Sequence, residues 1–224
     1  MNQEKWDELE RYTSGLLAKN DPHLNAALDA SQKAGLPAIQ VSPVEGRLLS
    51  ILAHSVGAKR ILEIGTLGGY STIWMARALA NGGRLISLEF DPKHAEVARG
   101  NIARAGLSDK VEIRLGPAIE SLPRLAKESV GPFDLTFIDA DKQSTWEYFE
   151  WAVKLSRPGS LIVVDNVIRH GELANAASNN SDVQGMRRFC ENLAKDTRVS
   201  GTVIQTVGSK GYDGFAIAVV LGGA

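Results

Sequence analysis

Short apolar runs alternate with helical segments along most of this chain, and this alternation constrains the fold more than any other feature. Each of the first five runs is followed by apolar residues at helical spacing. These runs read as strands at 60–64, 84–89, 111–115, 133–138 and 160–164. Strands that alternate with helices form a parallel sheet with helices on both faces. The chain should therefore fold as an α/β, doubly wound, mostly parallel sheet.

The chain ends differently. Two further apolar runs, at 201–207 and 215–221, lie on either side of the glycine-rich segment 208–214. Two strands separated by such a segment predict an antiparallel hairpin. The hairpin brings the expected number of strands to seven.

The first part of the chain is predicted to be helical. Apolar residues recur at helical spacing up to about residue 30, and Asp21-Pro22 is typical of a helix start. Ser42-Pro43, with Glu45 three residues after the serine, has the pattern of a capping box. We expect a single domain over residues 1–224, with an N-terminal helical extension at about 1–40.

Composition narrows the class of protein. The 224 residues are 44% hydrophobic, enough for one well-buried domain. Lys+Arg number 25 and Asp+Glu 26, so nothing favours nucleic acid or an anionic membrane as a partner. The single cysteine excludes an internal disulfide and favours a reducing compartment. Without a signal-peptide pattern or an apolar run of the ~18 residues that a membrane helix needs, we expect a cytoplasmic protein.

Acidic and amide side chains follow two of the predicted strands. Asp139 comes directly after one strand, and Asp165 and Asn166 come after the next. Ligands of open α/β sheets bind at the carboxyl ends of strands, so these side chains should share one crevice. Three oxygen ligands suit a hard cation such as Mg²⁺, with Ca²⁺ or Mn²⁺ as alternatives. Lys142 lies three residues past Asp139, which suggests a base acting beside the metal.

A second group of residues predicts a nucleoside ligand at the same edge. Segment 63–71 carries three glycines between the first strand and its helix, where the backbone can approach a ligand closely. Its spacing departs from GxGxxG, which argues against a dinucleotide. Glu89 ends the second strand, where a carboxylate can accept hydrogen bonds from both ribose hydroxyls.

Five stretches together resemble the cation-dependent S-adenosylmethionine (SAM) O-methyltransferases, the family of catechol and caffeoyl-CoA O-methyltransferases. These stretches are 63–71, 89–91, 137–142, 165–166 and 210–215. The resemblance covers roughly residues 36–221 and implies a class I methyltransferase, Rossmann-like fold and a homodimer. The Ala-Asp-Lys triplet after Asp139 is similar to the caffeoyl-CoA branch and its bacterial relatives.

By position, the resemblance implies a role for each site residue. Asp139, Asp165 and Asn166 would bind the metal, Lys142 would be the general base, and Asp139 would also lie near the methionine amino group. The residues implied to hold the methionine portion of SAM are Val41, Ser42, Glu63, Gly65 and Ser71. Those implied to hold its nucleoside are Glu89 at the ribose, with Phe90 and Ala118 at the adenine.

The predicted reaction is methyl transfer from SAM to a hydroxyl of a catechol-like or caffeoyl-type small molecule. Three features depart from the family pattern, namely Ser144 and Thr145 after the lysine, Ala216 in the hairpin, and the long loop 169–181. These departures leave the acceptor open. Two alternatives also remain open, a nicotinamide-dependent oxidoreductase on a Rossmann fold and a non-catalytic SAM-binding protein.

Overall fold

The computed structural model describes residues 2–19 and 21–222. Its α-helices are α1 (Gln3–Leu17), α2 (Pro22–Lys33), α3 (Pro43–Ser55), α4 (Tyr70–Arg77), α5 (Pro92–Arg104), α6 (Ala118–Lys127), α7 (Thr145–Lys154) and α8 (Ser181–Leu193). Its strands are β1 (Arg60–Ile64), β2 (Arg84–Glu89), β3 (Val111–Leu115), β4 (Phe133–Ile138), β5 (Ser156–Val164), β6 (Val199–Gly208) and β7 (Gly211–Val220). Two 3₁₀ segments, η1 (Lys142–Ser144) and η2 (Arg169–Ala174), complete the described elements.

The strands form one seven-stranded sheet in the order β3-β2-β1-β4-β5-β7-β6. Strands β1 to β5 pair in parallel, whereas β7 pairs antiparallel with both β5 and β6. The predicted doubly wound sheet with an antiparallel C-terminal hairpin is therefore confirmed. The strand order reverses between β1 and β4, which makes their carboxyl ends the expected place for a ligand.

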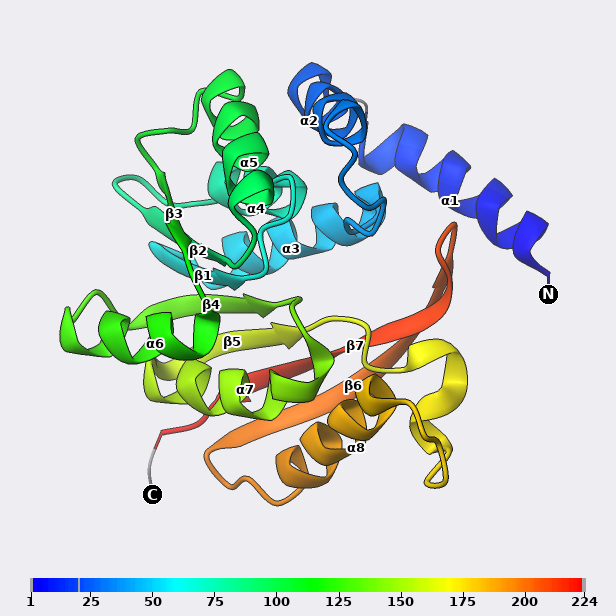
Figure 1. Ribbon diagram of the computed structural model, residues 1–224, viewed down its shortest axis with the longest axis vertical. Coiled ribbons are helices and arrows are strands. Elements are labelled where there is room, and N and C mark those ends of the chain that lie inside the picture. Colours follow the sequence, from blue (N-terminus) through cyan, green and yellow to red (C-terminus); the bar gives the residue numbers. More distant parts are fainter. Residues whose placement is uncertain (1, 20, 223–224) are drawn as a thin grey trace.

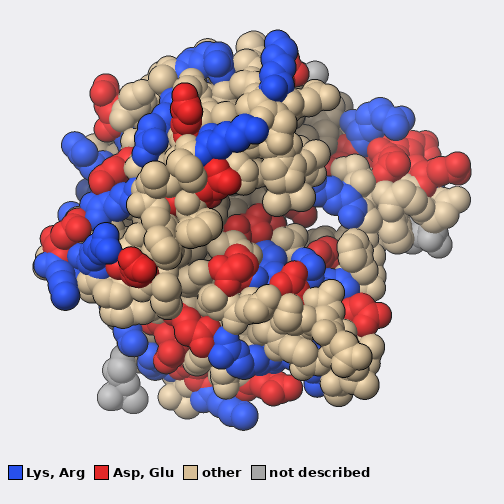
Figure 2. Space-filling model, in the orientation of Figure 1, with Lys and Arg blue, Asp and Glu red and all other residues tan. Residues whose placement is uncertain are grey.

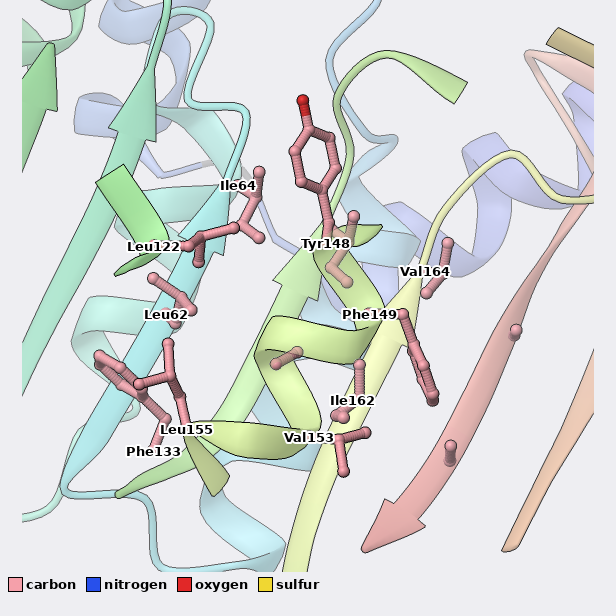
Figure 3. Packing of buried hydrophobic residues seen from close by; sticks show 14 of the residues in the cluster. Leu62, Ile64, Leu122, Phe133, Tyr148, Phe149, Val153, Leu155, Ile162 and Val164 are labelled. Carbon is pink, nitrogen blue, oxygen red and sulfur yellow. The ribbon is translucent and has the colours of Figure 1, made fainter. Parts of the chain in front are cut away.

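Helices cover both faces of the sheet, as Figure 1 shows. On one face, α2, α3, α4 and α5 pack over a core that includes Ile61, Ile73 and Phe137. On the other face, α6, α7 and α8 bury a second core around Leu122, Phe149 and Phe189, part of which is drawn in Figure 3. Strand β4 contributes side chains to both cores, because successive residues of a strand point to opposite faces. The sheet edge that carries the predicted site is thus backed by packed layers on both sides.

The helix starts predicted at Asp21 and Ser42 are confirmed, and in both helices the side chain of this first residue caps the helix. The Asp21 carboxylate accepts hydrogen bonds from the backbone N–H groups of His23 and Leu24 at the start of α2. At α3, Ser42 and Glu45 exchange the two hydrogen bonds of a capping box. These side chains satisfy N–H groups that have no partner inside the helix.

The hairpin and β5 differ from the prediction. We expected a seven-residue connection at 208–214, but the ladder continues to the pair Gly208 and Gly211, so that only Ser209 and Lys210 form the turn. Gly211 has a φ of +91°, a conformation that glycine adopts without strain. Strand β5 begins at Ser156, four residues before its predicted start at Ser160. Loop 169–181, predicted without secondary structure, contains η2.

Helix α1 projects from the body of the protein toward the tip of the hairpin (Figure 1). The Gln3 amide donates a hydrogen bond to the carbonyl oxygen of Gly208, and the Ser209 N–H donates to Glu10. Within residues 2–19 and 21–222, no helix has both the length and the apolar character that crossing a membrane requires.

Candidate active site

A cavity of about 700 Å³ opens at the carboxyl ends of β1, β2 and β4. Figure 2 shows a hollow in the middle of this view of the molecule, with acidic and basic side chains inside it. Nine of the predicted site residues line the cavity, namely Val41, Gly65, Ser71, Glu89, Phe90, Ala118, Asp139, Lys142 and Asn166. The structure therefore brings most of the predicted cofactor, metal and catalytic residues to one place, at the point where the strand order reverses.

Gly65 allows the turn that follows β1 to approach the end of β4 closely. Its φ is +99°, and a Cβ added there would overlap the carbonyl oxygen of Asp139. Only glycine allows this approach, because any side chain would push the two strand ends apart. The turn then enters α4 through Gly69, which has a φ of +80°. The five-residue segment from Gly65 to Gly69 thus begins and ends with a glycine in a conformation that L side chains rarely adopt.

Backbone hydrogen bonds of the sheet fix the positions of Asp139 and Asp165. Asp139 N–H donates to the carbonyl of Ile64, and Asp165 N–H donates to the carbonyl of Ile138. The two aspartates therefore follow neighbouring parallel strands in register. Burial and the nearby Asp139 carboxylate raise the pKa of Asp165 well above its usual range. A bound cation would relieve both effects.

Lys142 places a positive charge beside Asp139. Its ammonium lies 2.8 Å from Asp139 Oδ1 and 3.3 Å from the carbonyl oxygen of Asp165, and the residue is only 7% exposed. Asn166 has a φ of +56°, and its N–H donates to Asp165 Oδ1 at 2.7 Å. Asp139, Lys142 and Asn166 thus line one end of the cavity, and Asp165, which is not part of the lining, contacts this group through Lys142 and Asn166.

This donor set fits a hard divalent cation. Two carboxylates and one amide oxygen are ligands of the kind that Mg²⁺ takes while it keeps other positions for water or substrate. No cluster of three or more His, Cys, Asp or Glu side chains suited to a metal occurs among the described residues. Asp141 does not join the set, because it accepts hydrogen bonds from the Tyr148 hydroxyl and the Ser144 N–H and caps η1.

Comparison with known proteins decides the family. The sequence model of a family described as O-methyltransferase matches residues 16–217. A protein named catechol O-methyltransferase from Niastella koreensis is 54% identical over 220 residues, which cover 98% of this chain and all of that protein. The chain belongs to the O-methyltransferase family. The family and enzyme class predicted from the sequence are confirmed.

Solved structures agree with this assignment. An O-methyltransferase from Bacillus cereus, solved in complex with S-adenosylhomocysteine (SAH), has a TM-score of 0.96 and 53% identity over 98% of this chain and all of that one. An O-methyltransferase of tomaymycin synthesis from Streptomyces achromogenes, solved with SAM, has a TM-score of 0.96 and 48% identity over 99% of this chain and all of that one. The Rossmann-like methyltransferase fold expected from the sequence is therefore confirmed as well.

Within this O-methyltransferase, Glu89 organises the glycine turn. Its Oε2 accepts hydrogen bonds from the backbone N–H groups of Thr66 and Leu67 at 3.0 and 2.8 Å. Its Oε1 accepts from the N–H of Asp91 at 2.9 Å. A carboxylate buried with three backbone donors is held rigidly. Glu89, which was predicted to bind the ribose, lines the cavity and also holds the glycine turn in place.

Glu63 lies behind the cavity rather than in its wall. It is fully buried, and the hydroxyls of Ser71, Thr72 and Ser87 donate hydrogen bonds to it at 2.5 to 2.6 Å. Burial raises its pKa to about 7, despite these donors. Of the three residues predicted to hold the methionine amino and carboxylate groups, Gly65 and Ser71 line the cavity, whereas Glu63 accepts a hydrogen bond from Ser71 behind the cavity wall.

The remaining predicted contacts are divided between two cavities. Phe90, a residue that is 73% exposed, lines the first cavity, and Ala118 lines it as the first residue of α6. Val41 also lines it, but Ser42 lines a neighbouring cavity of about 560 Å³. The Ser42 N–H already donates to Glu45 Oε2 at 2.6 Å, so it is not available to the methionine portion in this arrangement.

Sequence reasoning missed two residues of the hairpin that lie beside this site, outside the lining of its cavity. Lys210, in the turn, lies within electrostatic range of both Asp139 and Asp165, although burial lowers its pKa. Asp213 binds the loop that follows Asn166. Both residues lie in the stretch that carried the family resemblance, which was the only sign of their importance. Antiparallel pairing of β7 with β5 brings them to the site, and strand alternation alone does not predict that pairing.

Proposed function

We propose that this protein transfers a methyl group from SAM to one hydroxyl of a catechol-like or caffeoyl-type small molecule, with a divalent cation in the site. The observation that carries the proposal is the group formed by Lys142, Asp139 and Asp165 at the end of a cavity large enough for a nucleoside cofactor. Relatives named catechol O-methyltransferase support a vicinal diol as acceptor.

SAM would occupy the main cavity, as supported by relatives solved with SAH and SAM. Glu89 and the Gly65 turn would receive its ribose and methionine portion, and Phe90 and Ala118 its adenine. Ser71 would bind the methionine end through a hydroxyl that Glu63 orients. The methyl group would then point toward the Asp139 end of the cavity.

Asp139, Asp165 and Asn166 would hold the cation, which we propose to be Mg²⁺, with Ca²⁺ and Mn²⁺ as alternatives. When bound, such a cation orients two vicinal oxygens and lowers the pKa of a bound hydroxyl. Lys142 would first release a proton to solvent and, as the neutral amine, would take the acceptor proton at Nζ. The acceptor oxygen then forms a bond to the methyl carbon while the carbon–sulfur bond breaks, and the electron pair of that bond neutralises the sulfonium.

The decisive experiment measures methyl transfer from SAM to catechol and to caffeate, with and without EDTA. We expect EDTA to abolish turnover and Mg²⁺ to restore it. Asp165→Asn should weaken Mg²⁺ binding, measured by calorimetry, whereas the matched control Asp109→Asn, in an exposed turn, should bind Mg²⁺ normally. Full activity in EDTA would refute the metal role. Calorimetry with SAM and NAD separates the methyltransferase from a nicotinamide-dependent enzyme, because only SAM should bind.

Three further features belong to the same proposal. The single-domain organisation over 1–224, with the helical extension at about 1–40, is supported by one sheet that runs from β1 to β7. A homodimer is supported by the family resemblance and by exposed Tyr12 and Leu16 on α1, and light scattering would test it. A cytoplasmic location is supported by the single cysteine, Cys190, and fractionation of cells would test it.

A further inference from the structure

We propose that Asp213 is a positioning residue for the metal site, because its carboxylate holds the loop that carries Asp165 and Asn166. The inference rests on the metal role proposed above. Asp213 lies in β7, almost fifty residues from these ligands along the chain, and it belongs neither to the donor set nor to the walls of the main cavity. Its action would therefore pass through the backbone that it binds.

One oxygen of Asp213 makes three hydrogen bonds. Oδ1 accepts from the backbone N–H groups of Ile168 at 3.1 Å and Arg169 at 2.9 Å, and from its own neighbour Gly214 at 2.9 Å. Val167 N–H donates to the carbonyl of Gly214 at 2.8 Å. Three consecutive residues after Asn166 thus donate their N–H groups to residues 213 and 214. Hydrogen bonds to a charged acceptor are stronger than neutral ones, so this contact holds the loop firmly.

The bound loop has a conformation that it would not keep unaided. Asn166, Arg169 and His170 have φ values of +56°, +51° and +57°. Side chains other than glycine pay a free-energy cost there, and such residues persist where the surrounding structure over-determines them. Here the surrounding structure is the start of β7. Removal of the Asp213 acceptor would allow the loop to relax toward ordinary backbone angles.

Relaxation of the loop would act directly on the metal ligands. The β5–β7 ladder ends at the pair Val164 and Ala216, immediately before Asp165. Beyond that pair, the loop donates its hydrogen bonds to Asp213 and Gly214. Asn166 therefore lies between two anchored points, Asp165 at the ladder end and Val167 at Gly214. A change at Asp213 should move the amide and carboxylate oxygens apart, while the glycine turn on the other side of the cavity stays bound to Leu88 and Glu89 of β2.

Gly214 shows how closely the hairpin and the loop are packed. A Cβ at this position would overlap the carbonyl oxygen of Ile204 and a side-chain carbon of Ile168. The hairpin tip is itself held by α1, through the bonds from Ser209 to Glu10 and from Gln3 to Gly208. These contacts hold in place the part of the hairpin that carries Asp213.

The test compares Asp213→Leu, Asp213→Asn and a matched control, Asp134→Leu. Asp134 accepts hydrogen bonds from the backbone N–H groups of Lys59 and Arg60 at the opposite end of β4. It is thus a carboxylate of the same kind, far from the metal site. For each variant, calorimetry gives the Kd of Mg²⁺ and, separately, of SAH, and thermal unfolding gives the Tm.

We expect Asp213→Leu to weaken Mg²⁺ binding about 10- to 100-fold, the usual effect of losing an outer partner of metal ligands. SAH binding should change less than about threefold. Asp213→Asn keeps an acceptor oxygen and should recover most of the Mg²⁺ affinity. Asp134→Leu should lower the Tm but leave the Mg²⁺ Kd unchanged.

Two results would overturn the inference. One is an unchanged Mg²⁺ Kd in Asp213→Leu. The other is a parallel loss of Mg²⁺ and SAH affinity in both Asp213 variants, which would indicate general unfolding. Failure of the unmodified protein to bind Mg²⁺ at all would instead refute the proposed metal role, so the two failures are distinguishable.

Discussion

The ammonium of Lys142 lies 2.8 Å from Oδ1 of Asp139, in a position that is almost closed to solvent. This ion pair joins the start of η1 to the end of β4. The same carboxylate is a proposed metal ligand, so a bound cation and the lysine would share one anionic partner. The position of the lysine and the proposed metal site therefore depend on the same carboxylate.

Replacement of Lys142 should reduce the chemical step and spare cofactor binding. We expect Lys142→Met to lower kcat by about 10²- to 10⁴-fold, the usual contribution of a general base. Lys142→Arg should not restore the rate, because arginine does not lose its proton in proteins. Steady-state assays with catechol measure kcat, and calorimetry checks that SAH still binds. Lys154→Met, on the exposed face of α7, is the control, and a near-normal kcat in Lys142→Met would remove the base from the mechanism.

Gly65 should tolerate no side chain. In Gly65→Ala the new methyl group would overlap the Asp139 carbonyl oxygen, and the φ of +99° would be strained as well. We expect a loss of about 1–3 kcal/mol in the free energy of unfolding, together with weaker binding of both SAH and Mg²⁺, since the two strand ends must separate. Urea unfolding and calorimetry measure the two effects.

Gly100→Ala provides the comparison for this prediction. Gly100 lies in α5, and a Cβ there would meet nothing within 4 Å. Alanine at such a position should be neutral or stabilise by about 0.5–1 kcal/mol, because it lowers the entropy of the unfolded chain and favours the helix. Equal effects at Gly65 and Gly100 would show that the strand-end contact is unimportant.

Glu63 should make stability depend on pH. Its pKa is raised from 4.5 to about 7 by burial, so the folded protein binds the proton more tightly than the unfolded chain does. The stabilisation from this group is fully present below about pH 4.5 and is lost as the pH rises toward 7. At 1.36 kcal/mol per pKa unit, the loss amounts to at most about 3 kcal/mol.

Urea unfolding at pH 5 and pH 7.5, without SAM, tests this dependence. Glu63→Gln removes the titrating group and should flatten the difference in unfolding free energy between the two pH values. Glu96→Gln, an exposed glutamate in α5, should leave the difference as it is in the unmodified protein. If Glu63→Gln and the unmodified protein have the same pH dependence, Glu63 is ionised throughout this range.

Local sequence patterns predicted the features that depend on neighbouring residues. Asp21 and Ser42 start helices because their side chains reach N–H groups two or three residues ahead, and the structure shows those bonds. Asp139 and Asp165 end neighbouring strands as expected, since parallel strands in register place their carboxyl ends together. The hairpin was predicted correctly, but its turn was not, because ladder bonds between β6 and β7 extend to the glycines that the sequence suggested were loop.

Features that depend on distant residues could not be predicted in this way. Glu63 was expected at the cofactor because of its place in the motif, yet three hydroxyls from α4 and β2 enclose it. Ser42 was expected there too, but its N–H donates a hydrogen bond to Glu45, and the residue lines another cavity. Burial and the choice of hydrogen-bond partner depend on how the layers pack, so the spacing of residues along the chain does not predict them.

The sequence by itself determined the order of strands and helices, the helix starts, and the two strand ends that supply Asp139, Asp165, Asn166 and Lys142. These follow from periodicity and capping, which act over a few residues. Only the tertiary structure decided that Gly65 must meet the Asp139 carbonyl, and that Asp213 holds the loop after Asn166. Those contacts join segments far apart in the chain, and they form because the sheet brings β1 beside β4 and β7 beside β5.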